Sequence, residues 1–170
     1  TGFNPTSTFT TWLITHSDTK LKFWSTSLSL LNSSAEINLW TISDLWINTW
    51  DFTFDFWFNA SSVGSPVSEF IGNYNYANDS SSFRLMYFND KSISFGINTI
   101  EWWYDSIITT PYELNTWNHI AAIKYGNKFL LFVNWIFEAE IVWWDTLTSS
   151  LNPIRVWNWS YNWWLYNTWN

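Results

Sequence analysis

The chain has 170 residues, of which 47% are hydrophobic and 23% aromatic, and it contains no cysteine. This composition predicts one globular domain with a sizeable core, and it excludes an intrinsically disordered chain and a fold held by disulfides. Fourteen acidic against seven basic residues give a net charge of -7, which repels nucleic-acid phosphates and anionic membranes. We therefore expect no nucleic-acid partner, and no membrane insertion because no apolar run approaches the roughly 20 residues of a spanning helix.

Alternating apolar and polar residues predict β-strands along the chain. The clearest strand is 52–59, where every second residue from Phe52 to Phe58 is a phenylalanine, so that one face lines a core. Only Ser43-Asp44-Leu45 could open a helical turn. The expected strands, in chain order, are 27–31, 36–39, 52–59, 67–71, 83–88, 93–97, 106–109, 117–125, 128–133, 136–142 and 154–157.

Short polar turns join several of these strands into hairpins. Residues 89–91 form one such turn, and Gly126-Asn127 forms another, in which both residues tolerate positive φ. No linker, charge run or internal repeat divides the chain. The spacing of strands and turns predicts a single all-β domain over residues 1–170, built as an antiparallel two-sheet sandwich.

Tryptophan and glycine occur in unusual numbers, 17 and 5 respectively. Glycine averages about 7% of residues, so a chain of this length would hold roughly twelve. At Asn134-Trp135 two alternating runs are separated by a two-residue connection, where Asn-Gly is typical of a type I′ turn. Tryptophan there must adopt a left-handed conformation, at a cost of roughly 1–2 kcal/mol. Similar turn or strand-edge positions hold Trp24, Trp46, Trp50 and Trp157.

Our hypothesis is that many of these tryptophans stand at UGA codons that the source organism or phage decodes as glycine. Glycine removes each local conflict because it adopts positive φ without a steric penalty. The alternative is a genuinely tryptophan-rich surface that binds sugars. Sequencing peptides of the native protein distinguishes the two.

The order of four segments is informative: 22–30, 51–58, 116–121 and 131–135. Together with Pro153 to Trp157 they resemble the laminin-G-like jelly-roll domains of the concanavalin A-like lectin/glucanase superfamily. The resemblance implies a jelly roll with Trp57 and Trp117 buried, and with glycine where Trp24, Trp135 and Trp157 stand. It also implies a further closing strand after Trp157, which we expect this chain to lack. We also expect the chain to be an excerpt of a longer protein.

The residues needed for catalysis do not form a recognisable pattern. Glucanases of this superfamily place paired carboxylates on one strand, whereas the nearest group here, Glu138, Glu140 and Asp145, is more typical of a solvated hairpin face. His16 and His119 lie too far apart to suggest a zinc site by their spacing, and His119 is expected to be packed and hydrogen-bonded. We expect no catalytic residue and no enzyme activity.

Loop carboxylates raise the question of calcium, which several laminin-G-like and lectin members bind. Asp79, Asp90 and Asp105 are the loop candidates, but they do not follow a recognisable ligand spacing. Ordinary turn chemistry is the favoured interpretation of all three. We therefore expect no metal site and no cofactor, with calcium as the lesser alternative.

Aromatic residues in or beside predicted loops form the candidate ligand-binding site: Tyr74, Tyr76, Trp103 and Tyr104. Such rings stack on the apolar face of a pyranose while neighbouring amides and carboxylates bind its hydroxyls. The alternative is that the two loop tyrosines near 75 pack under their own loop and that residue 103 is a recoded glycine.

These features predict a non-catalytic module that recognises a glycan or a surface protein and displays variable loops on a rigid scaffold. The resemblance implies an extracellular, cell-surface or virion location, within a larger bacterial surface protein or phage tail protein. A structural spacer domain without its own ligand is the second interpretation. A glucanase-like glycoside hydrolase is the third and has the least support.

Overall fold

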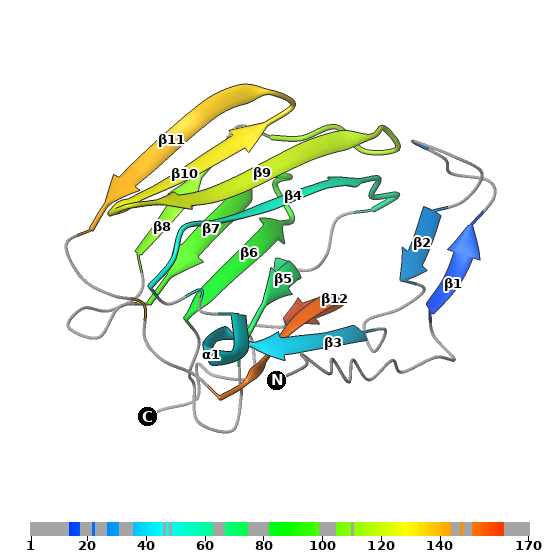
Figure 1. Cartoon of the computed structure of the whole chain (residues 1–170). Coiled ribbons are helices and arrows are strands. Elements are labelled where there is room, and N and C mark those ends of the chain that lie inside the picture. Colours follow the sequence, from blue (N-terminus) through cyan, green and yellow to red (C-terminus); the bar gives the residue numbers. More distant parts are fainter. Residues whose placement is uncertain are drawn as a thin grey trace, which may run out of the picture.

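We describe a computed structural model of the chain, which covers residues 14–17, 22, 27–30, 36–45, 47, 49–62, 67–74, 82–98, 105–109, 111–143, 147 and 151–161. Within these residues the chain is almost entirely β (Figure 1). The elements are β1 (Ile14–Ser17), β2 (Ser27–Leu30), β3 (Glu36–Thr41), α1 (Ile42–Leu45), β4 (Phe52–Phe58), β5 (Val67–Gly72), β6 (Phe83–Phe88), β7 (Ile93–Ile97), β8 (Asp105–Ile108), β9 (Asn118–Tyr125), β10 (Lys128–Val133), β11 (Ile136–Val142) and β12 (Pro153–Tyr161).

Two antiparallel sheets form the sandwich, as predicted (Figure 1). The first has four strands in the order β11-β10-β9-β4, and the second has six in the order β3-β12-β5-β6-β7-β8. A separate ribbon pairs β1 with β2. No helix in the part of the chain that the structure describes is long and apolar enough to cross a membrane.

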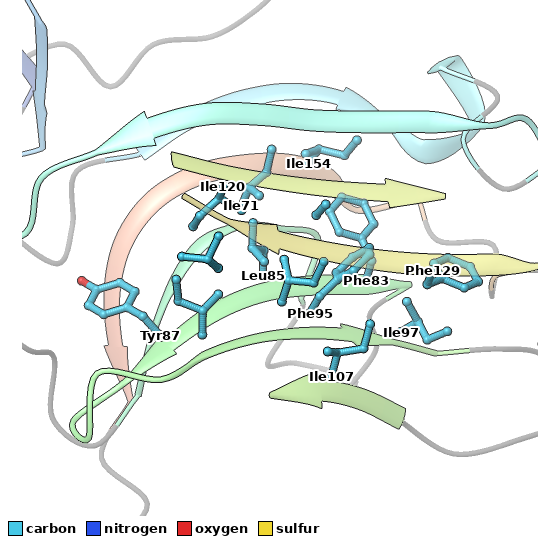
Figure 2. Close-up of a cluster of buried hydrophobic side chains, with 14 of the residues drawn as sticks. Ile71, Phe83, Leu85, Tyr87, Phe95, Ile97, Ile107, Ile120, Phe129 and Ile154 are labelled. Atoms are coloured by element: carbon cyan, nitrogen blue, oxygen red, sulfur yellow. The ribbon is translucent and has the colours of Figure 1, made fainter. Parts of the chain in front are cut away.

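The core lies between the two sheets, where the phenylalanine row of β4 faces β6. Phe52, Phe54 and Phe56 are half-buried and Phe58 is buried, whereas the alternating Thr53 and Asp55 are exposed. Phe54 stacks on the fully buried ring of Phe83, with ring centroids 4.9 Å apart. Figure 2 shows the side chains of the core converging from both sheets, and those labelled are Ile71, Phe83, Leu85, Tyr87, Phe95, Ile97, Ile107, Ile120, Phe129 and Ile154.

The predicted hairpins are all present. β6 pairs with β7, β9 with β10, and β10 with β11, each in antiparallel register. The turn between β9 and β10 uses Gly126 at a φ of 58°, and its N–H donates to Oδ1 of Asp51 at 2.7 Å. The turn between β10 and β11 has φ angles of 50° at Asn134 and 69° at Trp135. The left-handed conformation predicted for this tryptophan is therefore confirmed.

The helical turn predicted at Ser43 is present as α1, which begins one residue earlier, at Ile42. Thr41 and Asp44 form a reciprocal cap. The N–H of Asp44 donates to Oγ1 of Thr41 at 3.2 Å, and the N–H of Thr41 donates to Oδ2 of Asp44 at 3.1 Å. This arrangement satisfies backbone donors at the start of the turn.

Two strands differ from the sequence prediction. β1 was not expected, and it forms by pairing with β2 over four residue pairs. β12 extends to Tyr161, beyond the expected 154–157, because it lies inside the six-stranded sheet and pairs with both β3 and β5. Neither feature has a local signal, since each depends on a partner strand far away in the sequence.

The tryptophans occupy contrasting environments. Trp57 and Trp117 are half-buried rather than fully buried, and Trp57 lies on the face of β4 opposite to the phenylalanine row. Trp50 and Trp135 are 64% and 72% exposed. Trp24 and Trp46 lie outside the described residues, and of Trp157 the structure describes only the backbone, within β12.

Candidate ligand-binding site

Tyr74 lies two residues after the end of β5 and next to a buried polar network. The neighbouring Asn73 is fully buried, and its Oδ1 accepts hydrogen bonds from the N–H groups of Ser82 at 2.8 Å and Phe83 at 3.3 Å. Its Nδ2 donates to Oγ of Ser82 at 3.2 Å. These bonds tie the end of β5 to the start of β6, so the position of Tyr74 is set by the sheet.

A buried ion pair lies beside Tyr74. Nε of Arg84 donates to Oε2 of Glu69 at 2.8 Å, and the Glu69 side chain is only 1% exposed. The Arg84 guanidinium lies over the ring of Tyr74, 4.3 Å from its centroid, and is 17% exposed. Cations attract the faces of aromatic rings, so the arginine orients the tyrosine.

This cluster, formed by Tyr74, Arg84, Glu69 and Asn73, has the chemistry of a small polar recognition site. It offers a phenol, an aromatic edge and a fixed guanidinium, all prearranged by contacts within the sheet. Groups held in place before binding lose less entropy when a ligand arrives. The other predicted site residues, Tyr76, Trp103 and Tyr104, lie outside the described residues, so the structure places only Tyr74.

A second cluster, which the sequence analysis did not assemble, lies on the outer face of the four-stranded sheet. Its centre is His119, whose side chain is 1% exposed and whose Nε2 lies 3.0 Å from Oδ1 of Asp55. Because a carboxylate only accepts, this nitrogen carries the proton and donates. The imidazole is stacked under the Trp135 indole, with centroids 4.0 Å apart and planes 15° apart. The packed, hydrogen-bonded role expected for His119 is confirmed.

The aromatic side of this outer-face cluster continues across β4. Trp57 pairs with His119 in the sheet register, and their ring centroids are 5.0 Å apart. Nζ of Lys22 lies 3.7 Å from the centroid of the Trp57 ring. Alternation along β4 places Asp55 and Trp57 on one face, so this part of the cluster could have been found from the sequence.

The carboxylates considered for catalysis and calcium have ordinary partners where they are described. Glu140 is exposed and accepts from Nζ of Lys128 at 3.1 Å. Oδ1 of Asp90 accepts from the hydroxyl of Ser92 at 2.6 Å and from its N–H at 2.9 Å, which lowers the pKa of Asp90. Among the described residues no group of three or more histidines and acidic residues could hold a metal ion. Asp79 and Asp145, and the side chain of Asp105, are not described.

Comparison with known proteins identifies relatives by sequence profile and by shape. Residues 31–139, more than half of the chain, match the family described as the Concanavalin A-like lectin/glucanases superfamily. No curated protein sequence is significantly similar to the chain.

Several solved structures share the fold. The receptor-binding domain of botulinum neurotoxin type G has a TM-score of 0.63 at 15% identity, and the match covers 89% of this chain and 38% of that one. A CBM40 of the Ruminococcus gnavus IT-sialidase, bound to α2,3-sialyllactose, has a TM-score of 0.55 at 12% identity, with 67% and 66% covered. Domains LG4-5 of the mouse laminin α1 chain give 0.50 at 16% identity, with 62% and 27% covered. The chain thus spans less than half the length of the toxin and laminin structures.

Proposed function

Because the chain belongs to the concanavalin A-like lectin/glucanase superfamily, we propose that it is a non-catalytic module that binds a glycan. The observation that carries the proposal is the preorganised cluster at Tyr74, where a buried Glu69 carboxylate fixes Arg84 over the tyrosine ring. A guanidinium and a phenol supply directed hydrogen bonds to hydroxyl or carboxylate groups of a sugar. The ring supplies an apolar surface for the pyranose.

Two of the similar structures support this proposal. One is a receptor-binding domain, and another is a carbohydrate-binding module seen with a sialylated sugar. Binding a glycan from a rigid sandwich fits an extracellular or surface location, as part of a larger bacterial surface protein or phage tail protein. A surface protein is the alternative partner, recognised through the same loops.

Binding to a glycan array, followed by titration with the strongest glycan, tests the proposal. We expect Tyr74→Ala to weaken binding at least tenfold. Tyr125→Ala is the matched control, because this tyrosine is 68% exposed at the end of β9, away from the cluster, and its loss should leave affinity unchanged.

Two outcomes would overturn the proposal. If no glycan is retained, the chain is better described as a structural spacer. If Tyr74→Ala and Tyr125→Ala bind equally well, the Tyr74 cluster is not the site.

A further inference from the structure

The turn that carries Trp135 is fastened to the first residues of β9. The N–H of Asn134 donates to the carbonyl of His119 at 2.9 Å, and the N–H of His119 donates to Oδ1 of Asn134 at 2.9 Å. Nδ2 of Asn134 also donates to Oδ1 of Asn118 at 3.1 Å. Residue 135 is therefore held over the imidazole whatever its side chain.

The backbone at this turn suits glycine. Asn134 and Trp135 are two successive residues with left-handed φ angles of 50° and 69°, the geometry of a type I′ turn that favours Asn-Gly. The Trp135 side chain is 72% exposed, so most of the indole surface is not packed against the protein. Gly126, at the preceding turn, adopts nearly the same φ angle, 58°.

Beneath the indole lies a polar group that lacks a partner. Nδ1 of His119 is buried and has no hydrogen-bond partner among the residues that the structure describes. A polar atom that is buried without a hydrogen-bond partner is destabilising. Glycine at 135 would remove the ring that stacks over the imidazole at 4.0 Å and would uncover this face of the imidazole.

We propose that the native protein carries glycine at position 135, and that the face of His119 uncovered in this way binds a neutral pyranose together with Trp57 and Asp55. The apolar face of the sugar packs on the imidazole in the place of the indole, and a sugar hydroxyl donates to the Asp55 carboxylate, which is 56% exposed. The Trp57 ring supplies the apolar contact. This inference rests on the proposed glycan-binding function and adds a second subsite, on the opposite sheet from Tyr74.

The first part of the test is peptide mass spectrometry of the protein isolated from its source. The peptide that spans β10 and β11 should have the mass of a chain with glycine at 135. A peptide with tryptophan at 135 would overturn the inference.

The second part uses NMR of the imidazole signals of His119 in the Trp135→Gly chain. The probes are the methyl glycosides of glucose, galactose and mannose. At least one glycoside should shift these signals saturably. Asp55→Asn should raise the Kd obtained from the titration at least tenfold. Thr53→Ala, an exposed control on the same face of β4, should leave this Kd unchanged.

The absence of any saturable shift would overturn the site. If the Trp135→Gly chain still binds an array glycan through Tyr74 but leaves His119 unaffected, the subsite is wrong and the proposed function stands. If both forms of binding are absent, the proposed function is wrong as well.

Discussion

The turn at Asn134-Trp135 allows a quantitative test of backbone strain. A side chain in the left-handed region costs about 1–2 kcal/mol, a penalty that glycine does not incur. Glycine loses about 0.5–1 kcal/mol more than alanine through its larger conformational entropy in the unfolded chain. At the φ of 69° seen for Trp135, the chain with Trp135→Gly should therefore be more stable than the chain with Trp135→Ala by about 0.5–1 kcal/mol.

The parent chain should lie close to the glycine variant. Its indole stacks on His119 at 4.0 Å, and an aromatic pair of this kind contributes about 0.5–1.5 kcal/mol. This contribution roughly offsets what glycine gains at the backbone, so Trp135→Gly is expected to be nearly neutral. Trp135→Ala loses the stacking and keeps the strain, so it is expected to be the least stable of the three.

Urea unfolding followed by far-ultraviolet circular dichroism measures these differences. The matched control is the pair Thr53→Gly and Thr53→Ala, at an exposed residue of β4. Here the alanine variant should be the more stable, because glycine within a strand is about 0.5–1 kcal/mol less stable than alanine. If Trp135→Ala is as stable as Trp135→Gly while Thr53→Ala is more stable than Thr53→Gly, backbone strain does not set the stability of this turn.

Three further predictions concern the core and the buried polar groups. Phe83→Ala should lower the free energy of unfolding by about 3–5 kcal/mol in urea titrations, because this fully buried ring would leave a cavity; a loss below about 1 kcal/mol would contradict its place in the core. Burial raises the pKa of Tyr112, so its contribution to stability should be complete below about pH 10 and be lost as the pH rises further. Tyr112→Phe should reduce this alkaline loss in melting curves, and an unchanged loss would contradict it. Glu69→Gln leaves Arg84 without its buried counter-charge and should lower the free energy of unfolding in urea by about 2–3 kcal/mol. Glu140→Gln, at an exposed pair, should lower it by less than about 1 kcal/mol. Equal losses would contradict the burial of Glu69.

Local pattern predicted most of the sandwich. The alternation from Phe52 to Phe58 and the turn at Gly126-Asn127 fix strand faces and hairpin registers by themselves, and both are confirmed. β1 and the end of β12 could not be predicted in this way. Their short or mixed segments become strands only through pairing with distant partners, β2 in one case and β3 and β5 in the other.

The candidate site was only partly predictable for the same reason. Tyr74 could be placed beside a loop, but its partner Arg84 comes from the next strand and depends on the register of β5 with β6. The contact between His119 and Asp55 joins residues 64 positions apart, which no spacing in the sequence indicates. The sequence does indicate the strain at Trp135, because a two-residue turn between alternating strands requires positive φ, which tryptophan adopts only at a cost.

We propose that this sandwich binds a glycan and leaves it chemically unchanged. The most direct measurement is to incubate the strongest array glycan with an excess of the protein, recover the bound fraction and determine the mass of the glycan. We predict that the glycan is retained on the protein and returned with its original mass. Recovery of shortened glycan, or failure to retain any glycan, would contradict the account.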